Sequence, residues 1–175
     1  MAESKSVIVT DKMQLADLCS KWNTLDALAL DTEFIRTNTF YPKVGLLQVA
    51  DTDSCYLIDP LGISDWSDFA DLLVNQNVSI VLHSCSEDLG LLNTLLGVLP
   101  ASLFDTQVAA AFLGLGFSLS YQALVSEVTG VVIPKGETRS DWLHRPLSNE
   151  QLLYAAADVR YLLEIHGFLK QSLEE

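Results

Sequence analysis

The sequence predicts an α/β domain in which a mixed β-sheet has helices on both faces. Segments with strand character dominate residues 6–60, and helices alternating with one more strand follow them. The segment ALALDTEF at 27–34 opens with an uncharged apolar run, which is typical of a strand covered on both faces. We therefore expect residues 27–34 to lie inside the sheet.

The remaining elements follow one another with short connections. Strands are expected at 6–10, 27–34, 44–51, 54–60 and 78–84, and the second to fourth of these form a meander. Helices are expected at 11–22, 64–75, 86–97, 104–116, 119–130 and from Ser148 to about Lys170. Ser148 followed by Gln151 is a capping-box pattern that begins the last helix. The segment 132–147 is the longest irregular stretch.

The composition indicates a globular protein with an acidic surface. We expect residues 1–175 to form a single domain, because this length suffices for one buried core. Hydrophobic residues make up 49% and charged residues 19%, which argues against disorder. The net charge of −13 argues against a broad basic surface for nucleic acid, and it is compatible with an acidic site that binds divalent cations.

Cysteine usage and hydropathy bear on the compartment. Cys19, Cys55 and Cys85 are odd in number and lack CxxC spacing, so we interpret them as thiols in the reducing cytoplasm. The first residues show no export signal. Residues 106–126 carry no charge, but glycine, serine and glutamine interrupt them and no basic flank follows. We expect buried helices there rather than a membrane span.

Four acids and a tyrosine are candidates for one site. Asp31 and Glu33 alternate with Thr32 and so point to one side of their strand, where two like charges require a positive partner or a proton. Asp88 lies in the first turn of a helix. Tyr154 and Asp158 are four residues apart and share a helix face. Carboxylates from three such elements can converge on Mg²⁺ or Mn²⁺, which prefer oxygen ligands.

Each of these residues also has an ordinary structural interpretation. An acid pair after a strand is usually a turn or a cap, and Asp88 could simply favour the positive end of its helix. Tyr154 could be a core aromatic. Asp158 is hardest to explain in this way, because an unpaired carboxylate among the apolar residues of a helix is costly.

Three segments resemble the exonuclease motifs of the DEDD superfamily in its tyrosine-bearing branch. They are DTEF at 31–34, SEDLGLL at 86–92 and YAAADVRYL at 154–162. The blocks RTNTFYPKVGLLQVAD, LIDPLGISDW, FDTQVAAAFLG and TRSDWLHRPLSNEQLLYAAADV extend a resemblance to the ribonuclease D family over nearly the whole chain. Members of that family usually continue into C-terminal helical nucleic-acid-binding domains, which this sequence lacks, so we expect either a free-standing catalytic domain or a fragment of a longer protein.

The resemblance implies both a fold and an activity. The fold is the ribonuclease H-like three-layer α/β/α exonuclease fold with a mixed central sheet. Asp31, Glu33, Asp88 and Asp158 would hold two divalent ions, Mg²⁺ or Mn²⁺, and Tyr154 would orient the attacking water. The implied enzyme is a hydrolase, a 3′-5′ exoribonuclease that releases nucleoside 5′-monophosphates from the 3′ ends of transfer RNA precursors or other structured RNA.

Contacts to nucleic acid are also expected near these motifs. Phe34 could stack on the terminal base, since stacking needs no particular sequence, or it could belong to the core. Lys135, Arg139 and Arg145 lie in the irregular stretch before the last helix, where they either contact phosphates or are solvated loop charges.

Other functions compatible with these residues are a 3′-5′ exonuclease acting on single-stranded DNA, a non-catalytic nucleic-acid-binding domain on the same fold, and an enzyme acting on small nucleotides. The complete set of acids and the tyrosine argue against the non-catalytic alternative.

Overall fold

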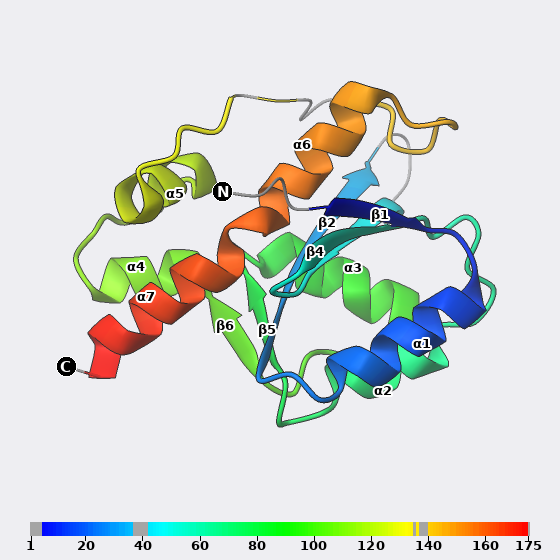
Figure 1. The fold of residues 1–175 in the computed structure, drawn as a ribbon, viewed down its shortest axis with the longest axis horizontal. Helices are drawn as coiled ribbons and strands as arrows, with labels where there is room; N and C mark the ends of the chain where they lie inside the picture. The colour runs from blue at the N-terminus through cyan, green and yellow to red at the C-terminus, as the bar shows by residue number, and fades with distance from the viewer. Residues whose placement is uncertain (1–4, 37–41, 135, 137–139, 175) are drawn as a thin grey trace.

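A computed structural model describes residues 5–36, 42–134, 136 and 140–174, which form one mixed sheet between two layers of helices (Figure 1). The strands are β1 (Lys5–Val9), β2 (Ala27–Ile35), β3 (Lys43–Ala50), β4 (Ser54–Ile58), β5 (Ser79–Leu82) and β6 (Leu103–Asp105). The helices are α1 (Lys12–Trp22), α2 (Ser67–Leu73), α3 (Ser86–Leu96), α4 (Thr106–Phe112), α5 (Tyr121–Thr129), α6 (Asn149–Arg160) and α7 (Leu162–Glu174).

The strand order in the described part of the sheet is β1-β4-β3-β2-β5-β6. Strands β2, β3 and β4 form the expected antiparallel meander, while β1 joins β4 in parallel and β5 and β6 continue in parallel beyond β2. Strand β2 therefore lies in the middle of the sheet, between an antiparallel and a parallel neighbour. The mixed sheet predicted from the order of the elements is confirmed.

Each face of the sheet packs against its own group of helices. Leu28 and Leu30 of β2 contribute to a core with α1, α2 and α3, while Ala29 between them contributes to a core with α4 to α7. This alternation is what two-sided burial of a strand requires. Its consequence is that Asp31 and Glu33, in phase with Ala29, belong to the face covered by α6.

Two predictions about the helices were wrong. A single helix was expected over residues 104–116. The first two of these residues instead belong to strand β6. Asp105 then caps α4 by accepting a hydrogen bond from the Gln107 amide at 2.8 Å. Three residues are too few to show a periodicity in the sequence. The last helix is divided at Tyr161 into α6 and α7, because the hydroxyl of Tyr121 accepts a bond from the Tyr161 amide at 3.2 Å.

Among the described residues, none of the helices combines the length and the apolar character that crossing a bilayer needs. Residues 106–126 instead contain α4 and α5 with a turn between them, as expected. The side chains of Cys19, Cys55 and Cys85 are buried thiols.

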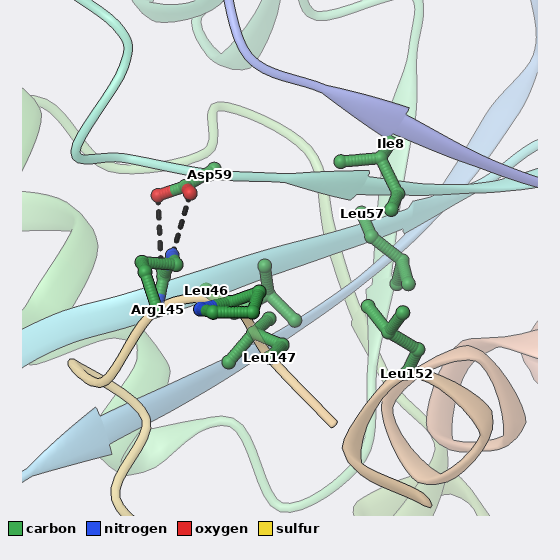
Figure 2. Close-up of a pocket in the computed structure, with 8 residues that line it drawn as sticks. Ile8, Leu46, Leu57, Asp59, Arg145, Leu147 and Leu152 are labelled. Carbon is green, nitrogen blue, oxygen red and sulfur yellow. Dashed lines mark hydrogen bonds and ion pairs between the residues drawn. The ribbon is translucent and has the colours of Figure 1, made fainter. Parts of the chain in front are cut away.

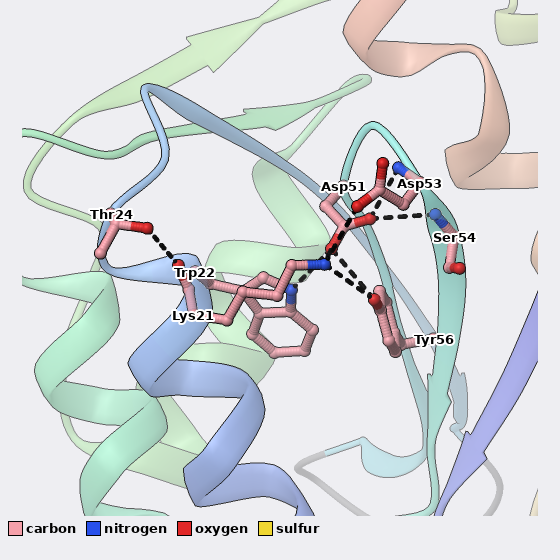
Figure 3. A network of polar contacts seen from close by, with 7 residues as sticks. All are labelled: Lys21, Trp22, Thr24, Asp51, Asp53, Ser54 and Tyr56. Carbon is pink, nitrogen blue, oxygen red and sulfur yellow. Dashed lines mark hydrogen bonds and ion pairs between the residues drawn. The ribbon is translucent and has the colours of Figure 1, made fainter.

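A buried carboxylate connects α1 to the turn between β3 and β4 (Figure 3). Asp51 accepts hydrogen bonds from Lys21 Nζ at 2.8 Å, Tyr56 Oη at 3.0 Å and Trp22 Nε1 at 3.3 Å, and it also accepts from the amides of the β3–β4 turn. These donors keep the pKa of Asp51 below its ordinary value even though burial acts in the opposite direction.

We expect Asp51→Ala to lower the free energy of unfolding by about 3 kcal/mol, because three side-chain donors lose a common acceptor. Asp53→Ala is the matched control: Asp53 also pairs with Lys21, at 3.3 Å, but its side chain is 71% exposed. Such an exposed pair should contribute less than about 1 kcal/mol. Denaturant unfolding of both variants measures the difference, and equal losses would contradict a structural role for the buried acid.

Candidate active site

The carboxyl-terminal half of β2 extends beyond its parallel neighbour. Strand β5 pairs with Ala27–Ala29 alone, whereas the pairing of β2 with β3 continues as far as Ile35. Ligand sites in open α/β sheets form at such points, where neighbouring strands diverge. Asp31 and Glu33 lie in this half of β2, so both carboxylates project from the sheet next to an interrupted edge.

Helix α6 brings the third acid and the tyrosine to the same place. It contacts β2, β3 and β4, and its capping box at Ser148 and Gln151 defines where it begins. One carboxylate oxygen from each of Asp31, Glu33 and Asp158 can be chosen so that all three lie within 4.8 Å of one another. Tyr154, one turn before Asp158, lines the same cavity as Asp31 and Asp158.

Asp88 lies beside this group rather than within it. It is 7% exposed, and one of its carboxylate oxygens accepts a hydrogen bond from the hydroxyl of Thr32, on the opposite face of β2 from Asp31. The turn that leads into α3 is held by Asp105, which accepts from the amides of Ser84 at 3.1 Å and Cys85 at 3.0 Å. Asp105 thus fixes the start of the helix that carries Asp88.

The electrostatics of the site disfavour its negative charges. Burial, followed by the charges of Asp88 and Asp158, raises the pKa of Asp31 well above its ordinary value. The same influences raise the pKa of Glu33 to about 8, and burial raises the pKa of Asp158 to about 7 and that of Asp88 to about 6. The metal-free site therefore retains protons near neutral pH, because ionising all of its desolvated acids would bring repelling charges together.

These shifts predict how the stability of the metal-free protein depends on pH. Because the folded pKa values exceed the unfolded ones, the folded state binds more protons, and stability should fall as pH rises from about 5 to about 8. Thermal unfolding in EDTA across this range measures the fall. Added Mn²⁺ should reduce it, because a cation replaces the protons. A stability that increases steadily over the same range would contradict this account.

The donor set fits a divalent metal. Three carboxylates within one small region supply the hard oxygen ligands that Mg²⁺ and Mn²⁺ prefer. Asp158 Oδ2 is buried and has no hydrogen-bond partner among the described residues. A cation would satisfy that oxygen and neutralise the repulsion at the same time. The arrangement is consistent with the expected metal ligands, although only three of the four acids form the close group.

A cavity of about 170 Å³ opens onto Asp31 and Asp158, and its lining includes two residues that were not predicted as site residues, Tyr121 and Gln122. Tyr121 donates to the Ala157 carbonyl at 3.0 Å and accepts from the Tyr161 amide, so it holds the segment on either side of Asp158. In the sequence Tyr121 is one aromatic residue in an amphipathic helix, with nothing to mark this function.

His83 also lines the cavity, and its ring is already engaged. Its Nε2 lies 3.0 Å from the Leu119 carbonyl and its Nδ1 lies 2.9 Å from the Thr106 hydroxyl. Burial lowers the pKa of His83, which favours the neutral ring. Because a carbonyl can only accept, Nε2 carries the proton. These contacts give His83 a structural role in the wall of the cavity.

The expected nucleic-acid contacts have different outcomes. Phe34 is half-buried on β2, directly after Glu33, with the Arg36 guanidinium 5.9 Å from the centre of its ring. Lys135 and Arg139 lie outside the described residues. Arg36 was not predicted, although it follows the first motif. It is 56% exposed and pairs with Glu87 at 3.4 Å, next to Asp88.

Arg145 is held by the protein itself (Figure 2). Its Nε and Nη2 donate to the two oxygens of Asp59 at 2.6 and 2.7 Å, and Nη2 also donates to the Gly45 carbonyl at 2.7 Å. Its Nη1 donates to the carbonyls of Trp142 and His144, both at 2.8 Å. All five guanidinium N–H groups are therefore used within the protein, which favours a structural role for Arg145 over the expected contact with phosphate.

The same contacts explain a glycine in β3. A side chain at Gly45 would place its Cβ 2.5 Å from the Cβ of Trp142, so only glycine allows the segment before α6 to approach the sheet this closely. The ring of Trp142 in turn lies 6.1 Å from the ring of Tyr154. Gly45 and Arg145 together thus help to position the tyrosine of the site.

Comparison with known proteins agrees with the fold and shows the family of the chain. A family model described as 3′-5′ exonuclease matches residues 6–174, and the chain belongs to this family. Its particular similarity is to ribonuclease D. The ribonuclease D of Pseudomonas paraeruginosa is 51% identical over 167 residues, which cover 95% of this chain and 44% of that protein.

Solved structures give the same result. Escherichia coli RNase D, described as an exoribonuclease involved in structured RNA processing, matches with a TM-score of 0.94 and 45% identity over 97% of this chain and 45% of the other. Brucella melitensis NrnC with bound Mg²⁺ matches with a TM-score of 0.82 and 26% identity over 97% of this chain and 82% of the other. The expected ribonuclease H-like exonuclease fold is confirmed. The chain spans less than half the length of the ribonuclease D proteins it matches.

Proposed function

We propose that this chain is a metal-dependent 3′-5′ exoribonuclease that removes nucleoside 5′-monophosphates stepwise from RNA 3′ ends. The observation that carries the proposal is the close group of Asp31, Glu33 and Asp158, in a chain that belongs to the 3′-5′ exonuclease family. Two of these acids, Asp31 and Asp158, line one cavity together with Tyr154. The similarity to ribonuclease D favours RNA over DNA. Transfer RNA precursors and other structured RNAs are the proposed substrates, and the cytoplasm is the proposed compartment.

The proposed cofactor is a pair of divalent ions, Mg²⁺ or Mn²⁺, held by Asp31, Glu33 and Asp158, with Asp88 completing the set. When bound, such ions activate water and stabilise the leaving 3′ oxygen of an in-line displacement. The chain itself supplies the charge that binds the ions, since the desolvated carboxylates gain most from neutralisation. Retention of metal by a protein with these acids replaced would contradict this assignment.

Tyr154 is proposed to orient the attacking water. Burial and the charges of Asp158, Glu33 and Asp31 raise the pKa of its phenol above the ordinary value, so the hydroxyl keeps its proton at neutral pH. It can therefore donate and accept hydrogen bonds but does not serve as a base. Phe34 and Arg36, next to the first acids on β2, are proposed to contact the terminal base and a phosphate.

A time course on a 3′-tailed RNA and on a DNA of the same sequence, each with Mg²⁺ and with Mn²⁺, tests the proposal. We expect the RNA to shorten from its 3′ end one nucleotide at a time, and EDTA to stop the reaction. A parallel preparation of Asp31→Asn controls for contaminating nucleases. Degradation of the DNA with the RNA left intact would overturn the choice of substrate. Binding of both without cleavage would favour the non-catalytic alternative.

A further inference from the structure

Gln48 of β3 is a buried amide next to the acids of the site. It is 0% exposed, and within the described part of the chain neither its Nε2 nor its Oε1 has a hydrogen-bond partner. Most buried side-chain amides in proteins are hydrogen-bonded, because an unpaired one loses its interactions with water and gains nothing in exchange. A group of this kind indicates a function that the metal-free protein does not display.

The register of the sheet places Gln48 directly opposite Asp31. The two residues are Cα partners across β2 and β3, and residues opposite one another point to the same face with Cβ atoms about 4.5–5.5 Å apart. Leu46 and Ala50, in phase with Gln48 along β3, pack in the core beneath α6. The amide therefore lies in the layer between the sheet and α6, on the same side as the carboxylate of Asp31.

The surroundings of Gln48 offer no structural reason for an amide. Its other strand neighbour, Leu57 of β4, is apolar, as are Leu46 and Ala50 on its own strand. A methionine or leucine would fill a similar volume and would avoid the loss of hydration. Across the same layer, the Oδ2 atom of Asp158 is also buried without a partner among the described residues. Unpaired polar atoms thus gather on the side of the metal-binding acids.

We propose that Gln48 is a positioning residue for the metal site: its side-chain N–H supports the carboxylate of Asp31 when Asp31 ligates a divalent cation. A ligating carboxylate usually has its remaining lone pairs hydrogen-bonded by a nearby group, and loss of such a partner typically weakens metal binding about 10–100-fold. This inference rests on the proposed metal-dependent function and extends it to a residue that touches neither the metal nor the RNA.

The test measures Mn²⁺ affinity and metal-free stability on the same proteins. Gln48→Met should weaken Mn²⁺ binding about 10–100-fold in a calorimetric titration, while its Tm in EDTA stays equal to or above that of the unchanged protein. Leu46→Met is the matched control, since it alters an apolar residue of the same strand and face, and it should leave Mn²⁺ affinity within about twofold. Gln48→Leu repeats the measurement if the methionine variant folds poorly.

The possible results are distinguishable. A lower Tm with unchanged Mn²⁺ affinity means that Gln48 is merely structural and overturns the inference. If the unchanged protein binds Mn²⁺ but does not cleave RNA, the proposed function fails and the role of Gln48 at the metal site is still decided by the affinities. If the unchanged protein binds no Mn²⁺, both proposals are wrong.

Discussion

Asp31→Asn is expected to abolish most RNA cleavage and at the same time to stabilise the metal-free protein. The substitution keeps the shape of the side chain but removes the ligand at the centre of the acidic group. Metal stabilisation of the transition state is worth several kcal/mol, and each 1.36 kcal/mol is tenfold, so the rate should fall at least about 10³-fold. Single-turnover cleavage of a labelled RNA measures this loss.

The stability gain has a separate cause. Burial, followed by the charges of Asp88, Asp158 and Glu33, raises the pKa of Asp31, so replacing its carboxyl group relieves both desolvation and repulsion. In EDTA at about pH 8 the Tm should rise by roughly 2–4 °C for each kcal/mol relieved. Asp71→Asn, at an exposed acid on α2, is the matched control and should change neither quantity. Turnover close to that of the unchanged protein would refute the metal assignment of Asp31.

Tyr154→Phe should give the second largest effect, a fall in kcat of about 10²-fold with KM nearly unchanged, since misplacing an attacking group by a small distance costs this much. Phenylalanine retains the ring that packs near Trp142 and against the backbone of Gly136, where an added Cβ would overlap the tyrosine ring. Only the hydroxyl is lost. Steady-state kinetics on a short RNA separates the two constants.

Tyr161→Phe provides the control for this variant, because it removes a hydroxyl from a residue that is not part of the cavity lining. It should leave both constants within about twofold. An increase in KM with kcat intact for Tyr154→Phe would mean that the hydroxyl binds the substrate and does not orient water.

Local patterns in the sequence were sufficient to predict the long helices and strands. The capping box at Ser148 and the uncharged run of β2 are encoded within a few residues, so both were predicted. The strand β6 and the division between α6 and α7 were not. A strand of three residues carries no period, and the break depends on the hydroxyl of Tyr121, which is distant in sequence.

The same distinction applies within the site. Asp31, Glu33 and Asp158 were singled out as charges in apolar surroundings. The family resemblance then suggested that they bind metal together. Gln48 and Arg145 could not be interpreted in this way. The amide of Gln48 matters because of what lies opposite it in the sheet, and the partners of Arg145 include Gly45 and Asp59, far away along the chain. Contacts of this kind depend on the fold and cannot be recognised from neighbouring residues in the sequence.

The saturated guanidinium of Arg145 has a consequence for how a chain of charge −13 could hold RNA. A guanidinium whose five N–H groups are all occupied has none left to bond a phosphate. It therefore cannot displace the counterions that surround a polyanion. Lys12, Lys21 and Arg36 are likewise paired with acids. These pairs reduce the positive charge that the described part of the chain offers to a nucleic acid, so the proposed divalent ions would supply a correspondingly larger share of the attraction.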